Sequence, residues 1–343
     1  MLRPLRTHWP YCRKRLREIA VPRIALLLSA TALAIAAGLA ASGCPGPDPS
    51  YRTTAAAGGG GGHETTSSSS GAAGSSSTST STSTSSTTTT TCDCPALDVL
   101  FVQDNSYSIT DYTVQLFPVL QQAGPAIQAV VERACSYHVG VVTSLPEKNN
   151  PTQCRTLGDL SRVNNLGQAC GVQNGIYITE QDIHAQQNFS QLILCLLTSE
   201  TQPDGTEQPM AAMFAALDPT RSAAGGCNEG FRRPGVPLLI ALITDADDTV
   251  SDVDGTPGPD PPSAWHDRLL SMAGNAQSLG IVAVIGPSSV QDGGECAAHA
   301  PRLHDFVDQF LPTYNVALSI CNPDPQAFEI GSKGVGDALC PPP

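Results

Sequence analysis

The sequence is poor in basic residues. Lys and Arg number 18 against 31 Asp and Glu in 343 residues. Seven of the basic residues and one acid lie in the first 43 positions, so the remainder carries 11 basic and 30 acidic residues, or about −19. A chain of this charge is repelled by phosphate backbones and by anionic lipid surfaces. The composition therefore excludes nucleic acid as a partner.

Several common catalytic motifs are also missing. The sequence has no Gly-x-Ser-x-Gly elbow, no P-loop and no Gly-x-Gly-x-x-Gly. A zinc site is disfavoured, because no Cys-x-x-Cys occurs. His138 lies in a predicted strand and is expected to pack in the core. His299 and His304 are five positions apart and are assigned no chemistry.

The N-terminus carries an export signal. A basic segment precedes an uncharged, largely apolar stretch from Ile24 to Ala41, followed by small residues. Leu39-Ala40-Ala41-Ser42-Gly43-Cys44 resembles a lipobox, so residues 1–43 are predicted to be a lipoprotein signal and Cys44 to be acylated. The alternative is an uncleaved membrane anchor, since the apolar stretch is about long enough to span a bilayer. Both place the rest of the chain outside the cytoplasm, in the cell envelope, attached to a membrane.

Residues 44–91 are predicted to be a disordered tether. Thr65–Thr91 contains 23 Ser or Thr in 27 residues and no charge, and a glycine run precedes it. Such a segment cannot bury enough apolar surface to fold. The folded domain is therefore expected to span 92–343.

The cysteines fit an exported domain. Ten of them fall within 92–343, an even number that predicts a disulfide framework. Closeness in sequence favours the pairs Cys154–Cys170 and Cys296–Cys321, the first closing a polar loop at 149–175 over the sheet edge. The remaining connectivity is not determined by the sequence.

The pattern of 92–343 predicts an α/β fold. Short apolar runs are typical of strands buried on both faces of a mostly parallel sheet. Helical patterns alternate with them, which favours a central sheet flanked by helices. The predicted strands are Val99–Val102, Val139–Val142, Leu238–Ile243, Ile281–Ile285 and Val316–Ile320, and the predicted helices are Asp182–Leu197, Pro209–Leu217, Ala264–Leu279 and Arg302–Leu311.

Polar oxygen ligands follow two of these strands. Asp104-Asn105-Ser106-Tyr107-Ser108 comes directly after the first, and Asp245 ends the strand at Leu238–Ile243. The carboxyl ends of strands in an open α/β sheet are where ligands bind. Carboxylate and hydroxyl oxygens suit Mg²⁺, Mn²⁺ or Ca²⁺ rather than a soft metal.

Together with Thr206 in Gly205-Thr206-Glu207, these residues resemble the metal-ion-dependent adhesion site of von Willebrand factor type A domains, and several segments resemble the bacterial surface-lipoprotein branch of that family. The resemblance covers about Asp98 to the C-terminus. It implies that the hydroxyls of Ser106, Ser108 and Thr206 ligate a divalent cation, Mg²⁺ first among them. It also implies that Asp104 and Asp245 act largely through bound water.

The same resemblance implies a function. A cation with few direct carboxylate ligands keeps a position for a carboxylate of a protein or extracellular matrix partner, which this acidic surface would otherwise repel. The expected function is therefore adhesion through a metal, without enzymatic activity.

Other interpretations stay open. Asp104 and Asp245 could serve only in turns and helix caps, in a metal-free domain of the same fold. An exported metal-dependent hydrolase is a further alternative, although the sequence offers no positioned general base. The acidic run from Asp245 through Asp248, with Asp252, Asp254 and Asp260, could bind a second cation, but a solvated loop is favoured.

Overall fold

The computed structural model describes residues 92–185, 187–203, 206–251, 260–289 and 299–342. The predicted signal (1–43), the acylation site Cys44 and the predicted tether (44–91) lie outside these residues. Within the described ranges, no helix has both the length and the apolar character needed to cross a membrane.

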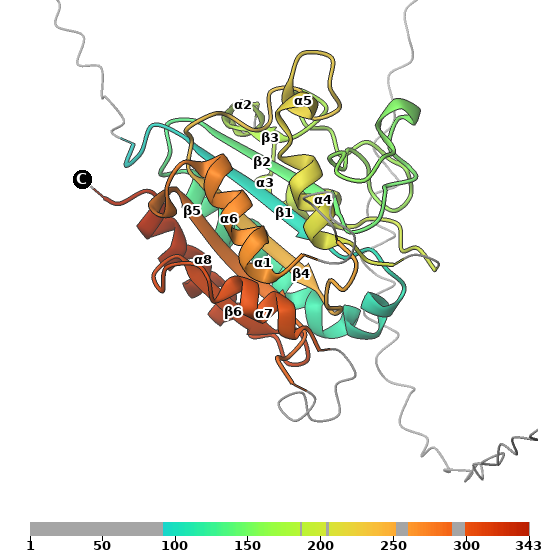
Figure 1. Cartoon of the computed structure of the whole chain (residues 1–343). Helices are drawn as coiled ribbons and strands as arrows, with labels where there is room; N and C mark the ends of the chain where they lie inside the picture. Colours follow the sequence, from blue (N-terminus) through green and yellow to red (C-terminus); the bar gives the residue numbers. More distant parts are fainter. Residues whose placement is uncertain (1–91, 186, 204–205, 252–259, 290–298, 343) are drawn as a thin grey trace, which may run out of the picture. The chain divides into compact units, whose positions relative to one another are not determined.

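The centre of the domain is one six-stranded sheet with the order β3-β2-β1-β4-β5-β6 (Figure 1). Every strand runs parallel to its neighbours except β3, which is antiparallel to β2. The predicted fold class, α/β with a mostly parallel sheet flanked by helices, is confirmed. The strands are β1 (Leu97–Gln103), β2 (Tyr137–Thr143), β3 (Ile178–Thr179), β4 (Leu238–Thr244), β5 (Leu279–Ile285) and β6 (Asn315–Ser319).

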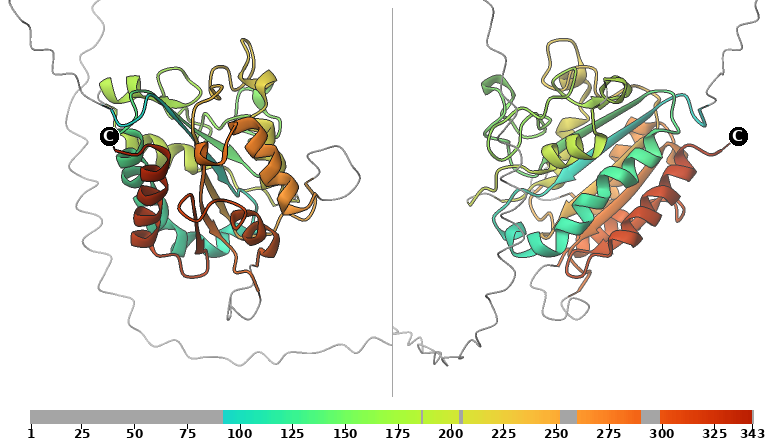
Figure 2. Two further views of the ribbon diagram at one scale, coloured as in Figure 1. Left: turned by 60° about the vertical axis from the view of Figure 1, so that its left-hand side comes forward. Right: turned by 180° about the vertical axis from the view of Figure 1, so that it is seen from behind.

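Helices cover both faces of the sheet. One face carries α1 (Thr113–Val131), α3 (Phe189–Leu197) and α8 (Pro325–Leu339). The other carries α4 (Pro209–Ala216), α6 (Pro262–Ala273) and α7 (Pro301–Val307). Figure 2 shows α1 and α8 side by side when the domain is seen from behind. The short helices are η1 (Ser108–Tyr112), η2 (Thr152–Cys154), α2 (Glu180–His184), α5 (Pro219–Ser222) and η3 (Ala276–Ser278).

All five predicted strands form, whereas the helix predictions need correction. The longest helix, α1, is not predicted, because Pro118 and Pro125 lie inside it and proline normally interrupts a helix. The predicted helix at 182–197 is two helices, α2 and α3. The helix predicted at 264–279 ends at Ala273, since Gly274 adopts a left-handed conformation (φ 87°) that closes it.

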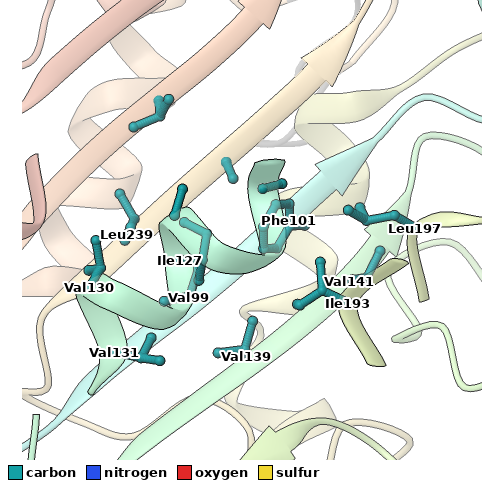
Figure 3. Close-up of a cluster of buried hydrophobic side chains, with 14 of the residues drawn as sticks. Val99, Phe101, Ile127, Val130, Val131, Val139, Val141, Ile193, Leu197 and Leu239 are labelled. Carbon is teal, nitrogen blue, oxygen red and sulfur yellow. The ribbon is translucent and has the colours of Figure 1, made fainter. Parts of the chain in front are cut away.

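The core has two halves, one on each face of the sheet. Successive strand residues point to opposite faces, so Val99 and Phe101 pack under α1 while Leu100 and Val102 pack under α4 and α6. Figure 3 shows the first half, where side chains of β1, β2 and β4 meet those of α1 and α3. Gly124 allows the close approach of α1 and α3, because a Cβ there would lie 2.6 Å from Ser190 Cα.

Four disulfides bind the described residues together. They join Cys92 to Cys135, Cys94 to Cys340, Cys154 to Cys227 and Cys170 to Cys195.

The predicted pair Cys154–Cys170 is therefore wrong. The prediction paired the two cysteines because they are close in the sequence. The fold instead places Cys154, in η2, beside the segment before β4, and Cys170 beside α3. The two bonds fasten the polar loop to its neighbours. Cys321 is disulfide-bonded, but Cys296 lies outside the described residues, so the pair Cys296–Cys321 stays a prediction.

The N-terminal end of the folded domain is held by ion pairs as well as by disulfides. Arg133, two residues after the end of α1, pairs with Asp93 at 2.6 Å and with Asp337 of α8, and donates to the carbonyl of Cys340. These contacts surround the disulfides of Cys92 and Cys94. The first and last segments of the domain are thus fastened to the same turn.

Candidate metal centre

Four of the five predicted metal-site residues lie together at the carboxyl edge of the sheet. The hydroxyl oxygens of Ser106 and Ser108 are 2.9 Å apart, and Ser108 donates to Asp245 Oδ1 at 3.2 Å. The Asp104 carboxylate is fully buried, and its negative charge contributes to raising the pKa of Asp245. The resulting cluster contains two carboxylates and two hydroxyls.

The parallel register explains why these residues meet. Gln103, the last residue of β1, is level with Thr143 at the end of β2 and with Ile243 in β4. Each chain turns away from the sheet just beyond these positions. Side chains that follow neighbouring strands are therefore brought to one edge.

Two residues that the sequence analysis did not identify hold Asp104 in place. Ser144 donates to Asp104 Oδ1 at 3.0 Å and Thr244 donates to Asp104 Oδ2 at 2.7 Å. The backbone N–H of Ser106 also donates to Oδ1, at 2.8 Å. Ser144 and Thr244 stand at or just beyond the ends of the strands that flank β1. The sequence could have indicated both, because each is a hydroxyl residue at the end of a predicted strand next to β1.

Asn105 fixes the loop between the ligands. It is fully buried, its side-chain oxygen accepts from the backbone N–H of Leu145 at 2.9 Å, and its amide donates to the carbonyl of Glu200 at 3.4 Å. The backbone carbonyl of Asn105 accepts from Gln202 at 2.8 Å. The segment that follows β1 is therefore joined to the segments after β2 and α3.

The charges of the cluster favour an added cation. Burial raises the pKa of Asp245 from 3.8 to about 7, and the negative charge of Asp104 adds to the effect. Two carboxylates that share a buried site repel each other. A divalent cation between them would remove that repulsion.

The donor set also fits a small hard cation. Mg²⁺ takes oxygen ligands, and the two hydroxyls, hydrogen-bonded to each other at 2.9 Å, lie beside the carboxylate of Asp245. No group of three or more His, Cys, Asp or Glu side chains in the described ranges could hold a metal. The candidate centre consequently depends on hydroxyl oxygens as well as on carboxylates.

For Thr206, the fifth predicted ligand, no hydrogen bond to the cluster is found among the described residues. It is exposed, and it follows directly on residues 204 and 205, which lie outside the described ranges. Its participation in metal binding stays a prediction.

The acidic loop after β4 performs a structural task in the part that is described. Asp247 accepts from the backbone N–H groups of Arg302 and Leu303 at the start of α7. Asp248 accepts from the N–H of Met210 at 2.9 Å, at the start of α4, and from Ser251. Carboxylates at helix N-termini are favourable in themselves. These contacts give Asp247 and Asp248 a structural role in the loop. The prediction of a solvated loop is wrong for Asp248 and Asp260, which are buried, because Asp248 turns inward to accept hydrogen bonds at the start of α4. Asp252 and Asp254 lie outside the described residues.

The histidines make structural contacts. His138 is half-buried, its Nδ1 lies 2.8 Å from the carbonyl oxygen of Phe231, and its ring packs on Tyr177 at 4.5 Å. His304 Nε2 lies 2.9 Å from the carbonyl oxygen of Gly286. His299 pairs by a short β-bridge with Ala246, next to Asp245.

An open pocket of about 440 Å³ adjoins the cluster. Ser108 and Asp245 line it, together with Tyr112, Asp247 and His299. The candidate centre is thus accessible through this pocket, and a side chain of another molecule could reach it there.

Comparisons with known proteins bear on the fold. No family model and no curated protein matches the sequence. Among solved structures, it is similar to proximal thread matrix protein 1 from the mussel byssus, with 15% identity and a TM-score of 0.40 over 73% of this chain and 49% of that one. It is also similar to a von Willebrand factor type A protein from Catenulispora acidiphila, with 14% identity and a TM-score of 0.37 over 72% of this chain and 43% of that one.

The match spans less than half of the length of these two proteins, and the likeness concerns the fold alone. The sheet order and the helices on both faces agree with the von Willebrand factor type A-like fold that the sequence motif implies. The class of protein defined by the fold is an α/β domain with a mostly parallel sheet, helices on both faces, and a hydroxyl and carboxylate cluster at its carboxyl edge.

Proposed function

We propose that this protein is an interaction module of the cell envelope that binds a protein or matrix ligand through a divalent cation. The observation that carries the proposal is the convergence of Asp104, Ser106, Ser108 and Asp245 beside an open pocket. Mg²⁺ is the first candidate, with Mn²⁺ and Ca²⁺ as alternatives.

In this proposal the hydroxyls of Ser106 and Ser108 hold the cation directly, and Thr206 completes the set. Asp104 and Asp245 act largely through water. The cation itself supplies an electrophilic position for a carboxylate of the ligand. That position matters because a carboxylate approaching a domain of such negative charge is otherwise repelled.

Exposed apolar side chains in the segment that follows β1 offer further contact area. Tyr107, between the two serines, is 64% exposed, and Val114, in the first turn of α1, is 84% exposed. Aromatic side chains at the surface often anchor protein partners. We propose that the ligand contacts these residues while its carboxylate binds the cation.

Hydrogen bonds hold the two carboxylates in place, which suits them to positioning a cation. Asp104 accepts hydrogen bonds from Ser144, Thr244 and the backbone of Ser106, and Asp245 accepts one from Ser108. Metal-dependent hydrolysis stays the second candidate function, because a carboxyl group with a pKa of about 7, as in Asp245, could also act as a general base. A hydrolase screen with and without chelator distinguishes the two.

The disulfides support a location outside the cytoplasm, because four of them join described residues and such bonds persist in oxidising compartments. We propose that acylation at Cys44 anchors the protein to a membrane and that 44–91 acts as a tether. The receiving membrane is proposed to be the outer membrane or the cell surface.

Calorimetric titration of the purified protein with Mg²⁺ tests the metal site. The wild type should bind one cation weakly, since hydroxyls and water-mediated carboxylates hold Mg²⁺ less firmly than a cage of direct carboxylates. Asp104→Ala should abolish binding and Ser106→Ala should weaken it. The control is Asp267→Ala, which removes a carboxylate that is 80% exposed on α6. Equal binding by wild type and Asp104→Ala would disprove the proposed site.

A pull-down from envelope extract tests the ligand. The protein should capture a partner in Mg²⁺ and release it in chelator, and Asp104→Ala should capture none. Capture that is unaffected by chelator would disprove a metal-mediated contact.

A further inference from the structure

A second cavity, of about 190 Å³, lies between the sheet and helices α1 and α3, and Asp104 forms part of its wall. Most of the surface of the wall is apolar and includes Ile109, Leu116, Leu120, Leu197 and Ile243, while seven of the twelve lining residues also carry polar groups. Leu197 lies at the end of the core shown in Figure 3. The cavity is distinct from the open pocket, with which it shares no lining residue.

One polar atom in this cavity wall has no partner. Gln103 lines the cavity and, two residues after Phe101, lies on the same face of β1. Its side-chain oxygen Oε1 is buried and makes no hydrogen bond to any residue within the described ranges. A buried acceptor without a donor is unfavourable. A ligand in this cavity would therefore have to supply a hydrogen-bond donor to the Gln103 oxygen.

We propose that this cavity binds a small, mostly apolar molecule with one hydrogen-bond donor, of which a phenol is the simplest example, and that the bound molecule changes the affinity of the metal centre. Small-molecule sites are typically apolar with a few placed polar groups. An engineered protein cavity of about 150 Å³ holds benzene, so the volume here is sufficient for a single ring.

The link to the metal centre rests on the proposed function and on shared residues. Asp104 belongs to both sites, and Ile109 lies next to Ser108 in η1, which leads directly into α1. A molecule held against Leu116 and Leu120 fixes the first turns of α1 and with them the Ser108 hydroxyl. Coupling between two binding sites is reciprocal, so the cation must change the affinity for the molecule by the same factor.

Fluorine NMR with 4-fluorophenol and 4-fluorotoluene tests the cavity in the full-length protein. The phenol should bind about fivefold more tightly than the toluene, which lacks the donor. Gln103→Leu should remove this preference, whereas Gln115→Leu, the same substitution at an exposed position of α1, should leave it intact. Equal affinities in the wild type, or a preference that survives in Gln103→Leu, would overturn the proposal.

A second variant keeps the test decisive if Gln103→Leu does not fold. Leu116→Phe fills the cavity from the opposite wall, so it should weaken the binding of both compounds. Binding of both with wild-type affinity in Leu116→Phe would place the compounds elsewhere and overturn the site.

Mg²⁺ titrations with and without saturating 4-fluorophenol test the coupling. The wild-type affinity for Mg²⁺ should change about fivefold, and in Leu116→Phe it should not change. Phenol binding that leaves Mg²⁺ affinity unchanged would overturn the coupling. Phenol binding in a protein that never binds Mg²⁺ would overturn the proposed function and the coupling, and would support the cavity as a separate site.

Discussion

Replacing Asp245 with Asn should stabilise the metal-free protein at neutral and alkaline pH. Asp245 is 5% exposed, and burial, with the added negative charge of Asp104, raises its pKa from 3.8 to about 7. A carboxyl group whose pKa is higher in the folded state contributes its full stability below about pH 4, and this is lost as the pH rises through about 7. Asn carries no charge at any of these pH values and still accepts the hydrogen bond from Ser108.

The expected size of the effect follows from the same two pKa values. A difference from 3.8 to about 7 corresponds to about 4 kcal/mol of folding free energy above pH 7, at about 1.4 kcal/mol for each pH unit. This is an upper bound, because local relaxation lets water reach the carboxylate. At about pH 4.5 the advantage of Asn should fall to about 1 kcal/mol.

Guanidinium unfolding in chelator, with the disulfides intact, measures this advantage at about pH 4.5 and about pH 8. The control is Asp267→Asn, whose carboxylate is 80% exposed and whose unfolding curves should follow the wild type. Adding Mg²⁺ at the higher pH should stabilise the wild type but not Asp245→Asn, since a ligand that binds only the folded state stabilises it. If wild type and Asp245→Asn lose stability equally between the two pH values, Asp245 does not carry a buried charge beside Asp104.

Three further predictions concern the anchor, the disulfides and the opposite edge of the sheet. Cys44→Ser should leave an unprocessed precursor that no longer partitions into detergent, and the same mass difference from the full-length chain in wild type and variant would count against acylation. Peptide mapping without reductant should recover Cys154 linked to Cys227, and a different partner for either would contradict the structure. Asp98→Ala should cost about 3 to 5 kcal/mol in denaturant unfolding, because Asp98 is fully buried between two arginines at 2.9 and 2.7 Å. As a comparison, Lys333→Ala breaks the exposed ion pair between Lys333 and Asp337 and should cost less than about 0.5 kcal/mol. Losses of similar size in Asp98→Ala and Lys333→Ala would refute the argument.

The sheet could be predicted because its signal is local. Residues 238–243 and 281–285 are apolar throughout and buried in the structure, and a strand buried on both faces requires such a run. The helix α1 could not be predicted in this way. Its two prolines oppose a helix locally, and packing against α3 and α8 overrides that preference.

The sequence predicted those residues of the candidate centre that lie in one short segment or at the end of a strand. Asp104, Ser106 and Ser108 follow a single run, and Asp245 ends another. Ser144 and Thr244 were missed, because their contribution depends on the register between β1 and its two neighbours.

The sequence by itself determined the composition, the negative charge, the alternating strands and helices, and the oxygen ligands that follow them. These properties depend on residues close together in the chain. Only the tertiary structure decided that Cys154 pairs with Cys227 rather than Cys170, and that Gln103 faces a cavity without a partner. Both depend on contacts between distant segments, which the packing of helices on the sheet creates and which no local pattern of residues contains.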